Sequence, residues 1–280
     1  MSLLGLIKLI RPLNSLMIGF AVIIGAFITN KSSSFLLLSF GFLTGFLISS
    51  FSMVMNDYFD LEIDKINMPN RPLVRGEVSP KEAISLSTVL LISGLLFSAL
   101  TGLFTFTIAL IFSIISFLYN WKLKELGLLG NVMVSLSISI PFIYGCALVQ
   151  RINMLILLMA LTAFLAGIGR EIIKGIVDIE GDEIRDVRSI ARTKGSKKAA
   201  LLGGVFFIAA VISSFLPMIF LDVSIYYMTL ISIVDVMFIV LALRIIKDFS
   251  KENALKVKKR ALYVMLLGLI SYLTEGVLGG

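Results

Sequence analysis

The chain has 280 residues, of which 58% are hydrophobic and only 15% are charged. Ordinary soluble domains are roughly 45 to 50% apolar and about 25% charged, so the surplus apolar surface must face lipid. The net charge of +7 is compatible with nucleic acid or with an anionic membrane surface. The single cysteine excludes an intramolecular disulfide. The lack of histidine excludes imidazole catalysis and the usual zinc sites, so any metal must be bound by oxygen.

Nine apolar runs approach the roughly 20 residues that a helix needs to cross a bilayer. They occupy residues 13–29, 35–55, 84–101, 103–119, 129–149, 153–170, 199–221, 224–243 and 261–278. The first run lacks a small-residue cleavage site, so we interpret it as a retained helix and not as a signal peptide. The sequence therefore predicts an all-α integral membrane protein with nine transmembrane helices. No linker-like segment divides it, and residues 1–280 are expected to form one domain.

The basic residues predict the orientation in the membrane. If the nine helices alternate in direction, every lysine and arginine except Lys31 and Arg151 falls on one side. The positive-inside rule places that side in the cytoplasm, with the N-terminus and the long loops at about 56–83 and 171–198, and the C-terminus on the outer face. A multi-pass protein of the cell membrane is expected, and nothing requires nucleic acid. The segment expected to bind anionic lipid headgroups contains Lys247, Lys251, Lys256, Lys258, Lys259 and Arg260.

Acidic residues are concentrated where the second span ends. Asn56, Asp60 and Asp64 are spaced four residues apart. At about 100° per helical residue, they fall within roughly 80° of one another. If the second helix continues through them, the three side chains share one face.

The same spacing recurs where the sixth span ends. Asp178, Asp182 and Asp186 are also four residues apart. Glu171 and Lys174 fall on the same side of the expected helix, within roughly 120° of arc. The two triplets therefore predict two acidic faces on the same, cytoplasmic side of the membrane.

These faces favour a divalent-metal site. Carboxylates at i and i+4 repel one another by a few tenths of a kcal/mol per pair, so a positive partner is expected. Oxygen ligands favour Mg²⁺, with Mn²⁺ or Ca²⁺ as alternatives, and Mg²⁺ usually completes its coordination with water and substrate phosphate. One triplet alone is more simply a solvated charged surface. Two matched triplets favour a diphosphate bridged between them by metal ions.

Basic and aromatic residues near these faces are candidates for supporting roles. A departing diphosphate needs positive groups fixed in place, although the positive-inside rule alone also explains basic residues in these loops. The candidate cations are Lys174, Arg71, Lys122 and Lys124. Tyr119 and Trp121 end the fourth span, where an aromatic ring either shelters an allylic cation or anchors the helix at the interface. We favour the anchor for Trp121 and leave Tyr119 open.

Ion-coupled transport is an alternative function. A transporter also uses acidic residues within the membrane, but its ion site is expected near the midplane on broken helices. The acidic triplets here lie at helix ends. Asp235 does lie within the eighth span, where an acid often marks function, but it is left without a role.

The chain resembles the UbiA-type intramembrane prenyltransferases over nearly its whole length. The paired acidic motifs are a specific signal, whereas either motif alone is weak. The resemblance implies a UbiA-like fold in which nine transmembrane helices surround a central cavity. The residues that carry it are Arg11, Pro12 and Asn14; Asn56, Asp57, Asp60 and Asp64; Asn70, Arg71, Pro72 and Leu73; Tyr119 and Lys124; and Asp178, Asp182 and Asp186.

The resemblance also implies an activity, Mg²⁺-dependent transfer of a prenyl group from a prenyl diphosphate to an acceptor in the lipid phase, with no protein partner. The implied metal ligands are Asn56, Asp60, Asp64, Asp178, Asp182 and, in a supporting position, Asp186. The residues expected near the diphosphate are Arg71, Lys124 and Lys174, with Asp57, Lys122, Arg11 and Asn14 around them. Lys174, Arg71, Lys124 and Tyr119 are the candidate catalytic residues.

Residues 56–79 are most similar to the archaeal branch of the family, and chlorophyll synthases are similar in the same segment. The archaeal branch implies transfer of a geranylgeranyl group to the glycerol hydroxyl of geranylgeranylglyceryl phosphate, forming the second ether bond of archaeal membrane lipids. An aromatic, quinone-precursor or chlorin acceptor is the alternative. A phosphate-bearing acceptor requires a further cationic group, and Arg11, Arg75 or Lys65 are candidates.

Overall fold

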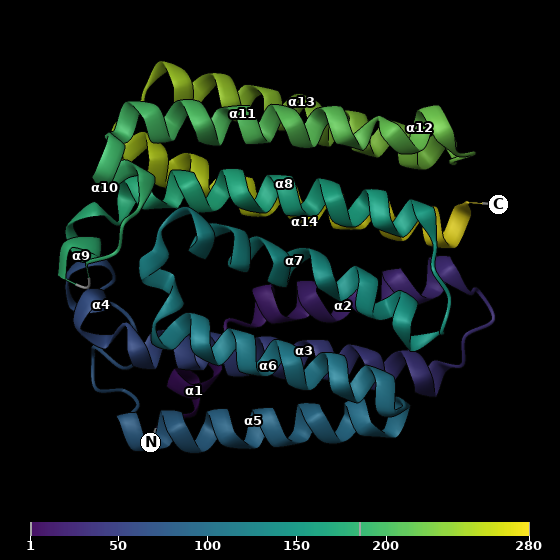
Figure 1. Cartoon of the computed structure of the whole chain (residues 1–280), viewed down its shortest axis with the longest axis horizontal. Helices are drawn as coiled ribbons and strands as arrows, with labels where there is room; N and C mark the ends of the chain where they lie inside the picture. The colour runs from purple at the N-terminus through teal and green to yellow at the C-terminus, as the bar shows by residue number, and fades with distance from the viewer. Residues whose placement is uncertain (1, 185, 280) are drawn as a thin grey trace.

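The computed structural model describes residues 2–184 and 186–279; Arg185, one of the basic residues counted on the cytoplasmic side, lies outside this part of the chain. Figure 1 shows long helices lying side by side, with the short helices α4, α9 and α10 at one end and α12 and the C-terminus at the other. The elements are α1 (Leu3–Leu9), α2 (Pro12–Thr29), α3 (Phe35–Phe59), α4 (Leu61–Asn67), α5 (Pro80–Thr101), α6 (Leu103–Trp121), the 3₁₀ helix η1 (Leu123–Leu126), α7 (Leu128–Leu148), α8 (Met154–Val177), α9 (Ile179–Ile184), α10 (Ile190–Lys194), α11 (Ser196–Ser214), α12 (Leu216–Phe220), α13 (Ile225–Lys247) and α14 (Lys251–Leu278).

The predicted membrane-spanning helices are confirmed. Within the described residues, nine helices are long and apolar enough to cross a membrane, with α11 and α12 counted as one span. Many large apolar side chains on their outer faces are exposed, such as Leu100 on α5 and Ile212 on α11, as expected for contact with lipid. The protein is therefore a multi-pass membrane protein. The last helix differs most from its predicted range of 261–278. It begins ten residues earlier, at Lys251, because Ser250 caps α14 and the polar residues that follow Ser250 are helical.

Local sequence explains where several helices begin. Ser79 starts α5 with a capping box, in which its side chain accepts from Glu82 N while the Glu82 carboxylate accepts from Ser79 N, and Pro80 follows at the first helical position. Ser34 and Asn153 cap α3 and α8 in the same way, by accepting a hydrogen bond from a backbone N–H of the first turn. These caps compensate for helix-end groups that would otherwise lack partners at the membrane surface.

Two glycines allow α2 and α7 to cross closely. A Cβ atom on Gly25 would lie 2.1 Å from the carbonyl oxygen of Phe142, and one on Gly145 would lie 2.3 Å from the carbonyl oxygen of Val22. Both distances are far below van der Waals contact, so neither position accepts a side chain without moving the helices apart. Small residues at such crossings are typical of membrane helices, which associate mainly through close packing.

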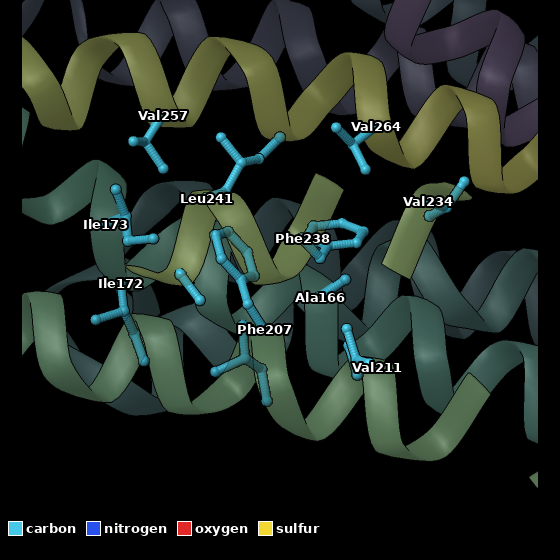
Figure 2. Close-up of a cluster of buried hydrophobic side chains, with 14 of the residues drawn as sticks. Ala166, Ile172, Ile173, Phe207, Val211, Val234, Phe238, Leu241, Val257 and Val264 are labelled. Atoms are coloured by element: carbon cyan, nitrogen blue, oxygen red, sulfur yellow. The ribbon is translucent and has the colours of Figure 1, made fainter. Parts of the chain in front are cut away.

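The buried core is divided into clusters on different groups of helices. The largest cluster is centred on α8, α11, α13 and α14, where the rings of Phe207 and Phe238 lie 5.0 Å apart (Figure 2), and it also includes residues of α2, α7 and α10. A second cluster joins α1, α3 and α5 around Phe51 and Val54. Residues of α2, α3, α6, α7, α8, α13 and α14 line a cavity of about 520 Å³ between these clusters. The prediction of helices arranged around a central cavity is thus confirmed.

We predict that Gly25→Ala destabilises the protein by about 1–3 kcal/mol or more, because the added methyl group overpacks the crossing of α2 and α7. The matched control is Gly268→Ala on α14, where the nearest atom to an added Cβ, Val234 Cγ1, is 3.8 Å away. Better helix propensity should make this control neutral or stabilising by up to about 1 kcal/mol. Thermal unfolding of the detergent-purified variants measures both effects. Equal melting temperatures for Gly25→Ala and the unmodified protein would contradict the close crossing.

Candidate active site

The two acidic motifs lie where a long helix changes direction. α3 ends at Phe59 and α4 begins at Leu61, with Asp60 between them at φ −92° and ψ 9°. α8 and α9 are joined in the same way by Asp178, at φ −98° and ψ 7°. The i to i−4 hydrogen bonds nevertheless continue through both bends, for example from Asp64 N to Asp60 O at 2.8 Å and from Asp182 N to Asp178 O at 2.9 Å. Each bend therefore keeps the four-residue spacing while turning α4 and α9 away from the spans.

Basic residues hold the carboxylates of the first motif. Arg71 donates to Asp57 at 2.6 Å and to Asp64 at 2.5 Å, and Arg11 also donates to Asp57. Lys124, in η1, donates to Asp60. Asp57, Asp60 and Asp64 are all nearly inaccessible to solvent. Because a buried carboxylate is stable only when it is paired, these contacts fix the first motif in place.

Asparagine side chains extend this network. Asn56 donates to Asp60 at 2.9 Å and to Asn120 on α6 at 3.2 Å. Arg11 donates to Asn56 at 3.3 Å, and its own backbone has φ 46°, in the left-handed region. That strained conformation links α1 to Pro12 at the start of α2. The ion pair with Asp57 offsets this strain, which is of order 1–3 kcal/mol.

The second motif is less completely paired. Glu171 accepts from Arg170 at 2.6 Å and from Lys174 at 3.1 Å. Asp178 Oδ1 has no hydrogen-bond partner among the described residues, and its ion pair with Lys258 Nζ spans 3.7 Å. The second motif thus presents a buried oxygen that is available to a ligand.

The two motifs face each other across one cavity. The cavity is lined by Asn56, Asp60 and Asp64 from the first motif and by Asp178 and Asp182 from the second. α4 and α9 are in contact, and Asn67 on α4 donates to the carbonyl oxygen of Asp178 at 3.4 Å. Below this polar end, the walls are mainly apolar, with Ala109, Phe112 and Phe142 among the lining residues. The arrangement suits a ligand with an anionic head and a long apolar tail.

Burial changes the acidity of both motifs. The pKa of Asp64 is raised to about 6, mainly because burial disfavours its charged form, and Arg71 opposes the shift. The pKa of Asp182 is also raised to about 6 by burial, against a hydrogen bond from Ser189. Both carboxylates therefore carry their charge less easily than usual, and a nearby positive ligand would stabilise the ionised form.

The residues fit a hard divalent cation by their chemistry. All candidate ligands are carboxylate or amide oxygens, which Mg²⁺ prefers, and Asp178 Oδ1 is buried without a hydrogen-bond partner. Within the described residues, no three acidic side chains are already gathered at ligand distances from a common point. Lys124 and Arg71 instead occupy the carboxylates of the first motif. Metal binding would therefore require these cations to turn toward a ligand phosphate.

Two sequence-based assignments are wrong in position. Asp186 does not share a face with Asp178 and Asp182, because α9 ends at Ile184 and Asp186 has φ 50°. Its side chain is 71% exposed and pairs with Arg192 at 2.8 Å, and the hydrogen bond from Arg192 lowers its pKa. Lys122 is 70% exposed, pairs with Glu125 and does not line the cavity. Neither side chain lies at the candidate site.

The remaining candidates do line the cavity. Arg11, Asn14 and Arg71 lie along its wall, as do the three residues Tyr119, Lys124 and Lys174. Asp57 is the exception, because it is buried and does not line the cavity, but it pairs with Arg11 and Arg71, which do. Asp235 also lines the cavity and accepts from Ser214 at 2.8 Å.

Sequence reasoning missed two basic residues and three amides that line the cavity, Lys258, Arg170, Asn67, Asn120 and Asn131. Lys258 was assigned to the segment that binds lipid headgroups, but only 8% of it is exposed. Its spacing from the fully buried Ala254 and Ala261 puts it on the inward face of α14. This helical periodicity could have indicated that Lys258 points inward, but the basic residues next to Lys258 in the sequence favoured a surface that faces lipid headgroups instead.

Comparison with known proteins agrees with this architecture. Residues 18–268 match the UbiA prenyltransferase family. The chain is 39% identical over 270 residues to digeranylgeranylglyceryl phosphate synthase of Archaeoglobus fulgidus, covering 94% of this chain and 92% of the relative. It is 35% identical to the protein of the same name from Pyrococcus furiosus, covering 99% and 100% of the two chains.

Two solved protein structures have the same fold as this chain. A structure described as concerning digeranylgeranylglyceryl phosphate synthase in membranes is 32% identical, has a TM-score of 0.75 and covers 98% of each chain. A UbiA homologue from Archaeoglobus fulgidus, solved with GPP and Mg²⁺, shares the fold at a TM-score of 0.73 and 18% identity, over 98% of this chain and 99% of the other. The family predicted from the acidic motifs is confirmed, and the chain belongs to the UbiA prenyltransferase family.

Proposed function

We propose that this prenyltransferase transfers a geranylgeranyl group from geranylgeranyl diphosphate to the glycerol hydroxyl of geranylgeranylglyceryl phosphate, with residues 1–280 acting as one domain. One observation carries the proposal: both acidic motifs face a single cavity that is charged at one end and mainly apolar beyond it. The names of relatives that match over nearly the whole chain support the lipid acceptor. Transport is not favoured, because the motifs lie at helix ends.

Mg²⁺ is the proposed cofactor, held by Asn56, Asp60 and Asp64 on one wall and by Asp178 and Asp182 on the other. The oxygen-only ligand set supports this choice, as does the UbiA homologue solved with GPP and Mg²⁺. When bound, the ion would neutralise the charge of the diphosphate.

The side chains of the cavity supply the remaining steps. Arg71, Lys124 and Lys174 bind the diphosphate and stabilise the charge that develops as its C–O bond breaks. The apolar walls hold the prenyl chain and keep water from the allylic cation, and the ring of Tyr119, which lines the cavity, stabilises that cation. The acceptor oxygen then forms the ether bond, with release of a proton and diphosphate.

The proposed orientation puts the site and the N-terminus on the cytoplasmic side and the C-terminus on the outer face. The positive-inside rule supports it, since the acidic motifs and the long basic loops share one end of the molecule. Figure 1 shows α4 and α9 at that end and the C-terminus at the opposite end. The donor and acceptor would enter from the membrane, with their phosphate groups at the cytoplasmic surface.

We predict that the purified full-length chain forms digeranylgeranylglyceryl phosphate from geranylgeranyl diphosphate and geranylgeranylglyceryl phosphate. Turnover should require added Mg²⁺ and stop with EDTA. Mass spectrometry of products from a panel that also contains an aromatic acid, a quinone precursor and a chlorin tests the acceptor class. A product on one of these other acceptors, and none on the glyceryl phosphate, would refute the proposed acceptor. Absence of turnover with every prenyl donor would favour transport.

We predict that Asp60→Ala and Asp182→Ala each lower kcat by at least about a hundredfold, because each removes an oxygen from one of the two facing motifs. Both variants should remain extractable and monodisperse. Glu62→Ala is the matched control, since Glu62 lies two residues after Asp60, in the first turn of α4, but is 70% exposed and pairs with Lys65. Asp186→Ala should also keep near-normal turnover. A normal rate for Asp60→Ala or Asp182→Ala would remove that residue from the site.

We predict that Lys174→Ala lowers kcat by about a hundredfold while changing the KM of the acceptor less than threefold, because the lysine is assigned to the leaving diphosphate. Lys197→Ala, an exposed lysine near the start of α11, is the control for loss of one positive charge. Steady-state kinetics with both substrates varied separates the two parameters. An effect confined to the acceptor KM would show that Lys174 has a different role.

A further inference from the structure

The acceptor proposed above brings a second anionic group into the cavity. The free hydroxyl and the phosphate of the acceptor are carried by the same glycerol unit. When the hydroxyl oxygen attacks the first carbon of the donor's prenyl chain, the acceptor phosphate must therefore lie within a few bonds of that carbon. That carbon is bonded to the donor diphosphate. The polar end of the cavity must therefore bind two anionic groups side by side, and the cations assigned to the diphosphate do not account for the second.

The three cations suggested from the sequence for this second group are poorly placed. Lys65 is 54% exposed and pairs with Glu62, and Arg75 is 55% exposed and pairs with Glu77. Neither lines the cavity. Arg11 does line it, but Arg11 belongs to the wall of the first motif, where it donates to Asn56 and shares Asp57 with Arg71, which is assigned to the diphosphate. Another cation is needed.

Lys258 has the required properties. It enters the cavity from α14, about two turns after the helix begins, and its side chain is only 10% exposed. Among the described residues, its Nζ has no hydrogen-bond partner, and its ion pair with Asp178 spans 3.7 Å. A buried ammonium group without hydrogen bonds is unfavourable, and a phosphate would supply several acceptors to its three N–H groups.

Arg170 lies on the same wall. It is on α8, against which α14 packs, and it also lines the cavity. One terminal nitrogen donates to Glu171 at 2.6 Å, whereas its Nε has no hydrogen-bond partner among the described residues. The buried Lys258 and the partly buried Arg170, each with an unused donor among the described residues, thus line the cavity from α14 and α8, whereas Arg71 and Lys124 line it from the wall formed by the first motif.

We propose that Lys258, supported by Arg170, binds the phosphate group of the acceptor and makes the enzyme selective for phosphate-bearing glycerol ethers. This inference rests on the proposed function and adds to it a residue that determines which acceptor is used. Lys258 would act on acceptor binding, while Arg71, Lys124 and Lys174 act on the diphosphate. If Asp178 binds a divalent ion, Lys258 loses its ion pair with Asp178 and becomes available to the phosphate.

The test compares two acceptors, geranylgeranylglyceryl phosphate and the same lipid without phosphate, geranylgeranylglycerol. Lys258→Gln should raise the KM of the phosphate-bearing acceptor by about tenfold to a hundredfold, the usual effect of losing a hydrogen bond to a charged group. The KM of geranylgeranyl diphosphate and the turnover of geranylgeranylglycerol should change less than about threefold. Lys258→Arg should restore much of the preference.

Lys259→Gln is the matched control, because Lys259 is the next residue of α14 and is exposed. It loses the same charge and should behave like the unmodified protein. Equal losses with both acceptors would overturn the proposal, since Lys258 would then act through Asp178 or on the donor. An unchanged KM in Lys258→Gln would overturn it as well.

A binding measurement keeps the proposal testable if Lys258→Gln does not fold. In EDTA and without donor, geranylgeranylglyceryl phosphate should raise the melting temperature of the unmodified protein more than geranylgeranylglycerol does, and sodium phosphate should compete. Equal stabilisation by the two lipids would refute a phosphate subsite. Failure of the unmodified protein to use either acceptor would instead refute the proposed function, so the two failures are distinguishable.

Discussion

The structure depends on burying carboxylates at the ends of two apolar helices. An unpaired buried charge is destabilising by several kcal/mol, and removing one partner of a buried ion pair costs about 3–5 kcal/mol. Arg11, Arg71 and Lys124 meet this requirement for the first motif, and they come from three separate parts of the chain. The ion pairs therefore tie the start of α2, the loop after α4 and η1 to the end of α3. The same contacts bring the cations that a diphosphate needs to the mouth of the cavity.

The two motifs are similar in sequence but are paired to different extents. The first is surrounded by hydrogen bonds from arginine, lysine and asparagine. The second has, within the described residues, an unsatisfied oxygen on Asp178 and unused donors on Arg170 and Lys258. A fully paired site is rigid and already organised, whereas unsatisfied buried groups gain most from a ligand. We infer that the first motif positions the diphosphate and that the second gains most of its stabilisation when substrate and metal bind.

The architecture was predictable because its determinants are local. Span positions follow from hydropathy, and the motif residues keep their spacing through the bends at Asp60 and Asp178 because the i to i−4 hydrogen bonds persist there. The predicted positions of side chains were wrong where tertiary structure determines them. Asp186 follows the end of α9 in a left-handed conformation, which a helical projection cannot anticipate. Lys258 is surrounded by basic residues in sequence, yet its neighbours on the helix face, Ala254 and Ala261, are fully buried. Its role depends on α14 packing against α8, which no local pattern contains.

The division of the core explains how such a site remains accessible to lipid substrates. One apolar cluster is centred on α8, α11, α13 and α14 and extends to α2, α7 and α10, and another joins α1, α3 and α5, so the two halves of the molecule each have a buried core. The cavity between the halves does not have to be filled for either half to be stable. The close crossing at Gly25 and Gly145 joins α2, which contacts α3, to α7, which contacts α8, and so links the two groups of helices. Each half carries one acidic motif, so a bound polar head would bridge them and add stability that neither half has alone. An apolar tail can then enter from the membrane without disturbing the packing that positions the charged groups.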